Sequence, residues 1–150
     1  MIAFDPGKIT GYARCYFDDN NKPIDFIVGS FNTWTEVHQE VSCQSLLGEN
    51  GLVILERYFL RGQTDPIVAE VSGAVKAYCE RYECKYVLQE PSVPDFMYDR
   101  FSLKGKMRGI TNKQHGKDAL CHLLYYLYTN KFILEEDVLR IVKDCGIIKT

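Results

Sequence analysis

The sequence lacks the features that define several large classes of protein. It contains no Cys-x-x-Cys pair, and its cysteine and histidine residues do not have the spacing of a zinc site. It also contains no apolar run long enough to span a bilayer, no signal peptide, no internal repeat and no low-complexity segment. These absences argue against a zinc finger, a membrane-spanning chain and a repeat protein.

Charge and cysteine content set further limits. The 150 residues carry a formal net charge of -2, which argues against a protein that coats nucleic acid with its whole surface but allows a local basic patch. A chain of this length is expected to form one domain, residues 1–150, with a sizeable core. Because the six cysteines are scattered, we expect reduced thiols, mostly in the interior, and a cytoplasmic location.

Hydrophobic periodicity predicts strands that alternate with helices. Thr33-Trp34-Thr35-Glu36 has the pattern of a capping box, and Asp65-Pro66 is typical of a helix start. This order favours an α/β fold with a mixed sheet flanked by helices. The predicted strands cover 1–4, 10–17, 24–31, 52–55 and 85–88, and the predicted helices cover 65–82, 114–128 and 135–144, after a first helix that begins at the capping box.

Two of the predicted strands end in a carboxylate. Asp5 follows the apolar run at residues 2–4, and Glu56 follows Leu52-Val53-Ile54-Leu55. A side chain at a strand end can project towards solvent or a metal ion. The alternative for the first position is that Asp5-Pro6-Gly7 only forms a tight turn, since these residue types are common in turns.

The predicted helix at 114–128 carries the third candidate group. Its leucines share one face, whereas His115, Asp118 and His122 fall within a narrow arc on the other. We interpret these three as a polar row in which His122 either hydrogen-bonds Asp118 or lies on the surface. A simple solvated face is the alternative.

The three carboxylates become informative when they are considered together. If Asp5, Glu56 and Asp118 converge at one edge of the sheet, they form an oxygen-rich site that suits Mg²⁺ or Mn²⁺ better than zinc. Two such ions can coordinate a phosphodiester, activate water and stabilise the leaving oxygen. Neighbouring carboxylates also repel one another, which favours cation binding.

These residues resemble the motifs of the RuvC-like Holliday-junction resolvases of the RNase H-like superfamily. Asp5-Pro6-Gly7-x-x-Thr10-Gly11-Tyr12 resembles the first motif of that family. Glu56 followed three residues later by Phe59 resembles the second, and His115-Gly116-Lys117-Asp118-Ala119 resembles the last. The order and spacing agree across nearly the whole chain.

The resemblance implies an RNase H-like fold with a central mixed five-stranded sheet flanked by α-helices. It further implies a homodimeric, Mg²⁺-dependent endonuclease that nicks branched DNA and leaves 5′-phosphate and 3′-hydroxyl ends. Asp5, Glu56 and Asp118 would bind the metal, with two ions per site and with Mn²⁺ as a substitute for Mg²⁺. His115 would be a fourth active-site group, as a ligand or as a charge near the scissile phosphate. The expected setting is the cytosol of a bacterium or of a phage-infected host, in DNA recombination and repair.

A basic segment at residues 99–117 is the expected contact for the DNA backbone. We interpret it as a mobile loop, or a short helix flanked by one, and a solvated loop without a DNA role is the alternative. Phe59, beside Arg61, would correspond to the aromatic residue that wedges against junction bases, although it could equally cap the core. The candidate basic residues are Arg61, Arg100, Lys104, Lys106, Arg108, Lys113 and Lys117.

Other functions remain in competition with a junction resolvase. The same fold and metals could serve a ribonuclease H-like enzyme or a packaging-type nuclease that acts on RNA–DNA hybrids, flaps or linear duplex. A non-catalytic junction-binding module is also possible. An actin-like ATPase is disfavoured because the chain is short and has no second glycine-rich phosphate loop, so we expect no nucleotide cofactor and no membrane partner.

Overall fold

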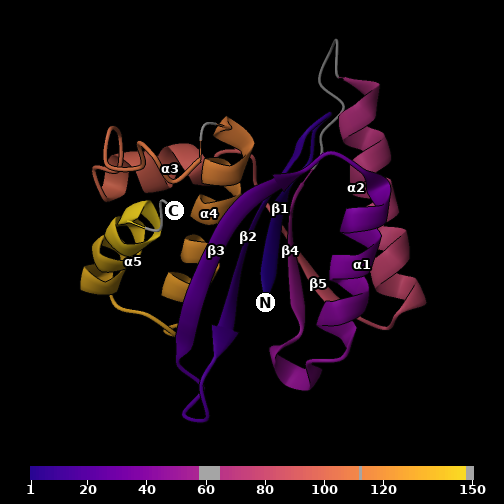
Figure 1. Cartoon of the computed structure of the whole chain (residues 1–150), viewed down its shortest axis with the longest axis horizontal. Helices are drawn as coiled ribbons and strands as arrows, with labels where there is room; N and C mark the ends of the chain where they lie inside the picture. Colours follow the sequence, from indigo (N-terminus) through magenta and orange to yellow (C-terminus); the bar gives the residue numbers. More distant parts are fainter. Residues whose placement is uncertain (58–64, 112, 148–150) are drawn as a thin grey trace.

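The computed structural model describes residues 1–57, 65–111 and 113–147. It contains a five-stranded mixed sheet with helices on both faces, and Figure 1 shows α1 and α2 on one side and α3, α4 and α5 on the other. The predicted α/β class and mixed sheet are therefore confirmed. The elements are β1 Ile2–Asp5, β2 Thr10–Phe17, β3 Pro23–Phe31, α1 Trp34–Ser45, η1 Gly48–Asn50, β4 Leu52–Glu56, α2 Pro66–Arg81, β5 Lys85–Gln89, α3 Val93–Arg100, α4 Gln114–Thr129 and α5 Glu135–Ile147.

The sheet has the strand order β3-β2-β1-β4-β5. The first three strands form an antiparallel meander, and β1, β4 and β5 are parallel neighbours. Parallel strands need a crossover, which α1 supplies between β3 and β4 and α2 supplies between β4 and β5. Since β1 and β4 are parallel and adjacent, their carboxyl ends, Asp5 and Glu56, lie at the same edge of the sheet.

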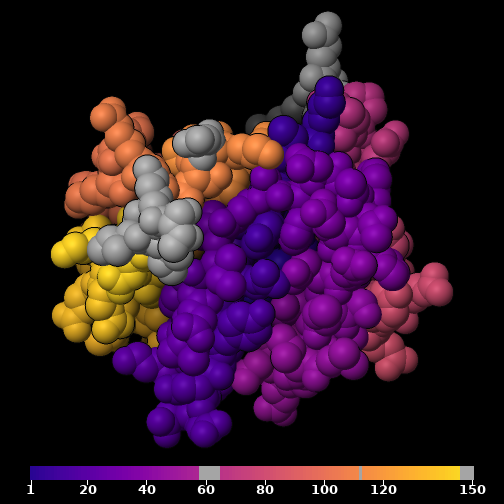
Figure 2. Space-filling view, viewed as in Figure 1, coloured from indigo at the N-terminus to yellow at the C-terminus, as the bar shows by residue number. Residues whose placement is uncertain are grey.

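Alternation along the strands divides the core into two layers. Ile2, Phe4 and Leu55 pack in the core under α1 and α2, whereas Ala3 and Ile54 pack in the core under α4. Successive side chains of a strand point to opposite faces. Asp5 and Glu56, two residues after Ala3 and Ile54, therefore point to the same side of the sheet, towards α4. Figure 2 shows how the side chains of β3 form a surface between the two helical layers.

The predicted helix starts are confirmed by hydrogen bonds. The Glu36 backbone N–H donates to Thr33 Oγ1 over 3.4 Å, and the Thr33 N–H donates to Glu36 Oε2 over 3.2 Å, which completes the capping box. The Ile67 N–H donates to Asp65 Oδ1 over 3.0 Å at the start of α2. Both caps satisfy backbone N–H groups that a helix leaves without intrahelical partners.

One helix was absent from the sequence prediction. Helix α3 occupies Val93–Arg100, directly after the predicted strand ending in Gln89-Glu90-Pro91. Pro94 lies in its first turn, where proline removes no intrahelical hydrogen bond. The prolines argued against a helix at this position in the sequence. The helix is stabilised by tertiary contacts, since Val93 and Met97 are buried against the α4 side of the core.

The basic segment after α3 forms consecutive turns in the part of it that the structure describes. Phe101, Leu103 and Met107 are buried, and the Leu103 N–H donates to the Tyr98 carbonyl over 3.0 Å. These anchors hold residues 101–111 against the helices, so this stretch is neither an unsupported loop nor a separate helix.

Cysteine burial agrees with the prediction of interior thiols. All six are free, Cys43 is exposed, and the other five are buried. Among the described residues, the helices are too short or too polar to cross a membrane.

Candidate active site

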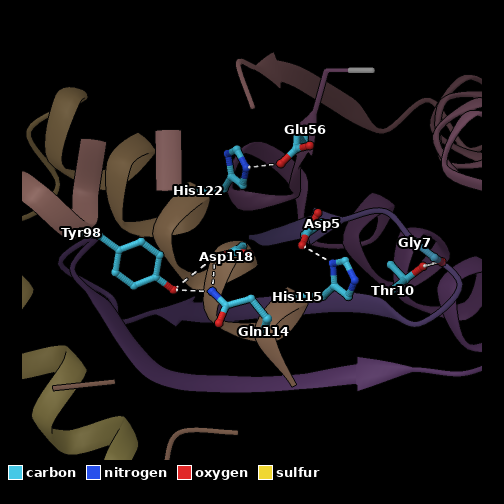
Figure 3. A network of polar contacts seen from close by, with 9 residues as sticks. All are labelled: Asp5, Gly7, Thr10, Glu56, Tyr98, Gln114, His115, Asp118 and His122. Atoms are coloured by element: carbon cyan, nitrogen blue, oxygen red, sulfur yellow. Dashed lines mark hydrogen bonds and ion pairs between the residues drawn. The ribbon is translucent and has the colours of Figure 1, made fainter. Parts of the chain in front are cut away.

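Asp5 and His115 form the first pair of the site. Asp5 ends β1 with only 6% of its surface exposed, and its Oδ2 lies 2.6 Å from Nδ1 of His115 in the first turn of α4. Figure 3 shows the imidazole lying between Asp5 and the turn that contains Gly7 and Thr10. The Thr10 hydroxyl donates to the Gly7 carbonyl over 3.2 Å and so holds that turn closed. The structure thus brings together two of the site residues predicted from the sequence, Asp5 and His115.

Glu56, the second carboxylate of the site, is held by His122 of α4. The Glu56 side chain is 22% exposed, and its Oε2 accepts a hydrogen bond from Nε2 of His122 over 3.0 Å. The other ring nitrogen, Nδ1, lies 2.8 Å from Oε1 of Gln89. Gln89 ends β5 in register with Glu56, so both side chains point towards α4. The imidazole is therefore fixed at both of its nitrogens.

This contact corrects the predicted role of His122. His122 was expected either to hydrogen-bond Asp118 or to lie on the surface, but its ring is completely buried and bonded to Glu56. A helical wheel identifies the leucine face as the one that packs and leaves the opposite arc to solvent. In the structure α4 contacts both the sheet and α3, so His122 is enclosed at the strand ends, whereas the His115 side chain stays 47% exposed.

Asp118 is the third carboxylate, and two neutral donors hold it. Its Oδ1 accepts hydrogen bonds from the Tyr98 hydroxyl over 3.1 Å and from Nε2 of Gln114 over 2.8 Å. Gln114 Nε2 also lies 3.0 Å from the Tyr98 hydroxyl oxygen, so the three groups form a closed triangle (Figure 3).

The carboxylates are close enough for their charges to interact. Burial, followed by repulsion from Glu56, raises the pKa of Asp5 to about 6, against the lowering effect of the His115 hydrogen bond. Burial also raises the pKa of Asp118, against the hydrogen bonds from Gln114 and Tyr98. Nevertheless, across residues 1–57, 65–111 and 113–147, no three His, Cys, Asp or Glu side chains form a ready-made metal cluster. Each carboxylate is instead turned towards its own hydrogen-bonding partner.

Two glycines allow the start of α4 to approach the sheet. A Cβ on Gly11 of β2 would collide with the carbonyl of His115, and a Cβ on Gly116 would lie 2.9 Å from the carbonyl oxygen of Gly29 in β3. Backbones can approach this closely only where side chains are missing. The glycine after Thr10 in the first motif therefore sets the position of His115.

The basic residues predicted to contact DNA are distributed unevenly. Lys104, Arg108 and Lys117 line one pocket of about 330 Å³ together with Tyr98 and Gln114, directly beside Asp118.

Among the described residues, three candidates do not line that pocket: Arg100, Lys106 and Lys113. Lys106 is exposed and Lys113 is half-buried. Arg100 is paired with Glu135 of α5 over 3.0 Å, which ties α3 to α5. Phe59 and Arg61 lie outside the described residues.

Three site residues were missed by the sequence interpretation. Gln114 had a usable signal, because it lies four residues before Asp118 on the same helix. Gln89 had a weaker one, since it directly follows a predicted strand, as Glu56 does. Tyr98 had none, because α3 itself was not predicted.

The strand order, with helices on both faces of the sheet, defines an α/β fold with carboxylates at one edge of the sheet. Neither a family model nor a curated protein sequence matches the chain.

Solved structures with the same fold do match. T. thermophilus RuvC, in complex with Holliday junction substrate, is 17% identical over 87% of this chain and 95% of its own, with a TM-score of 0.59. The fowlpox virus Holliday junction resolvase is 16% identical over 87% of this chain and 99% of its own, with a TM-score of 0.52. These matches confirm the fold that the motifs implied.

Proposed function

We propose that this protein is a metal-dependent endonuclease that nicks branched DNA, with four-way junctions as its principal substrate. The observation that carries this proposal is that Asp5, Glu56 and Asp118, from β1, β4 and α4, lie close enough for their charges to interact at one edge of the sheet. The likeness to a RuvC structure that holds a Holliday junction, and to a viral junction resolvase, supports the choice of substrate.

The residues present fit a divalent cation by their chemistry. Burial, followed by repulsion from Glu56, raises the pKa of Asp5, and a cation offsets that repulsion. Carboxylate oxygens are the ligands that Mg²⁺ and Mn²⁺ prefer. Asp5, Glu56 and Asp118 would hold the metal, with His115 as a further ligand or a nearby charge. When bound, two ions would supply activation of water and stabilisation of the leaving oxygen.

The protein's own contribution is orientation. His122, clamped by Gln89, holds one oxygen of Glu56. Tyr98 and Gln114 hold one oxygen of Asp118. These contacts use Oε2 of Glu56 and Oδ1 of Asp118, so the second oxygen of each carboxylate takes no part in them. A site kept in order by such neighbours loses little freedom when it binds its ligand.

The pocket beside Asp118 supports binding of the DNA backbone. Lys104, Arg108 and Lys117 carry positive charge at its walls, and such groups attract phosphates without regard to sequence. Tyr98 and Gln114 line this pocket and also hydrogen-bond Asp118, so a phosphate bound there would lie next to Asp118. The four-way junction has two symmetric strands to cut, so we further propose that the protein acts as a homodimer with paired sites.

The test is cleavage of a labelled synthetic four-way junction beside linear duplex, flap and RNA–DNA hybrid substrates, with Mg²⁺, with Mn²⁺ and with chelator. Paired symmetric nicks in the junction that disappear with chelator are expected. Asp5→Asn, Glu56→Gln and Asp118→Asn should each abolish nicking and leave junction binding nearly unchanged. Preferred cleavage of the hybrid would make the protein a ribonuclease H-like enzyme, and tight junction binding without cleavage would make it a binding module.

A further inference from the structure

A second pocket lies on the other side of the Asp5 turn. It has a volume of about 240 Å³ and is enclosed by the turn after β1, the start of α1 and the first turns of α2. Its apolar wall includes Phe31, Val37 and Val71, which are buried. At its rim are Lys8 and Trp34, of which Trp34 is 41% exposed. We refer to this cavity as the Trp34 pocket.

The Trp34 pocket is separated from the candidate active site by one residue of backbone. Gly7 lines the pocket, and a Cβ placed on it would lie 3.3 Å from Cε1 of His115, which in turn holds Asp5. A group in the pocket and a group beside Asp5 are thus within the reach of a single nucleotide. The continuity of the two sites indicates that they share one ligand.

The chemistry of the pocket favours a nucleobase over a phosphate. An exposed indole beside an apolar wall offers a stacking surface, and base–aromatic stacking depends little on sequence. Glu70, which is exposed at the α2 side, would repel a phosphate but can accept hydrogen bonds from the edge of a base. Lys8, next to the Asp5 turn, is placed to attract the backbone of that nucleotide. The volume is below the usual range for drug-sized ligands, about 300–1,000 Å³, and suits one base.

We infer that the Trp34 pocket binds an unpaired nucleobase of the cleaved strand, adjacent to the scissile phosphate, with Trp34 as the stacking residue and Glu70 as a base-reading residue. This inference rests on the proposed nuclease function, because it assigns the pocket to the same strand. It gives the protein a source of base preference at the nick. It also requires that the substrate have unstacked bases, which branch points provide and continuous duplex does not.

Trp34 is the only tryptophan in the chain, so its fluorescence reports on the pocket directly. The experiment titrates the full chain, in chelator, with a four-way junction, a short single-stranded oligonucleotide and a linear duplex, while anisotropy of the labelled DNA measures binding separately. Saturable quenching by the junction and the single strand, with little change on duplex binding, is expected.

Two variants sharpen the assignment. Trp34→Ala should weaken single-strand binding about tenfold, in line with the loss of one stacked base, and Trp34→Phe should restore most of it. Leu47→Ala is the matched control, because Leu47 is also 41% exposed and follows α1 at its other end. Glu70→Gln should change which base is preferred at the nick, whereas Leu47→Ala should leave that preference as in the wild-type protein.

The outcomes separate this inference from the proposed function. Junction binding and nicking with constant Trp34 fluorescence would overturn the pocket assignment and leave the nuclease intact. A fluorescence change on protein dilution without DNA would show that a second copy covers the pocket, and would also overturn it. Quenching by single strands in a protein that nicks no substrate would support the pocket and overturn the nuclease.

Discussion

His122 Nε2 lies 3.0 Å from Oε2 of Glu56, and this contact joins the buried face of α4 to the end of β4. The histidine is completely buried and its second nitrogen is engaged by Gln89. The position of a candidate metal-binding carboxylate is therefore set by a side chain that no metal would need to touch.

Replacing His122 should affect both stability and nicking. His122→Leu leaves Glu56 and Gln89 without their shared partner, and an unsatisfied buried polar group costs about 1–3 kcal/mol. Urea unfolding should show a loss of this size, and the nicking rate should fall more than junction binding. In a double-mutant cycle, Glu56→Gln combined with His122→Leu should cost less than the sum of the single changes. Full additivity would show that the two side chains do not interact.

Asp5 should destabilise the metal-free protein at neutral pH. Its pKa is raised from 3.8 to about 6, so the folded state binds a proton more tightly than the unfolded state does. Stability in chelator should therefore fall as the pH rises from about 4 to about 6. Asp5→Asn should flatten this dependence and gain about 1–2 kcal/mol at pH 7, less than the full shift because the His115 hydrogen bond is weakened. Thermal melting across this pH range measures both, and a variant with the wild-type profile would contradict the prediction.

The same Asp5 variant also shows whether a cation relieves this destabilisation. Mg²⁺ or Mn²⁺ should raise the melting temperature of the wild-type protein, since a ligand that binds only the folded state stabilises it. The same ions should raise the melting temperature of Asp5→Asn by a smaller amount. Equal shifts in the two proteins would place the bound ion elsewhere.

Gly11 should tolerate no side chain. Gly11→Ala would drive a methyl group into the carbonyl of His115, and relief requires α4 to move away from β2. Overpacking of this kind costs about 1–3 kcal/mol or more, and nicking should be lost as His115 is displaced. Gly73→Ala is the control: Gly73 lies inside α2 with open space where an added Cβ would lie, so the change should be neutral or stabilising by up to about 1 kcal/mol. Similar unfolding curves for both variants would contradict the close approach.

The cations of the pocket beside Asp118 should control the salt dependence of binding. Changing Lys104, Arg108 or Lys117 to Ala should weaken junction binding and reduce the slope of log affinity against log salt by about one for each phosphate that the protein no longer neutralises. Lys85→Ala provides the comparison, because Lys85 starts β5 at the opposite end of that strand from Gln89. Titrations at several salt concentrations measure the slopes. An unchanged slope in the pocket variants would show that Lys104, Arg108 and Lys117 do not contact the DNA.

Tyr98 should act through Asp118. Tyr98→Phe keeps the ring and removes the hydroxyl that donates to Asp118 Oδ1. We expect a lower single-turnover nicking rate with unchanged junction affinity, because Gln114 still holds the carboxylate. Tyr98→Phe combined with Gln114→Ala should reduce the rate further, and a double variant with the wild-type rate would show that Asp118 needs neither partner.

Local signals were sufficient for most of the secondary structure. The apolar runs that end at Asp5 and Glu56 became adjacent parallel strands, and the patterns at Thr33 and Asp65 became helix caps. These features depend on residues close together in the chain. Helix α3 was missed because its stability comes from burial of Val93 and Met97 against distant residues, which no local pattern records.

By itself, the sequence determined which groups reach the edge of the sheet. Asp5 and Glu56 each follow an apolar strand, and helical spacing places His115 and Asp118 on one side of α4. Only the tertiary structure decided what each carboxylate touches. It buried His122 and turned it to Glu56, and it brought Gln89 and Tyr98 into the site. Hydrogen bonds between elements depend on how those elements pack, and packing depends on the whole chain at once.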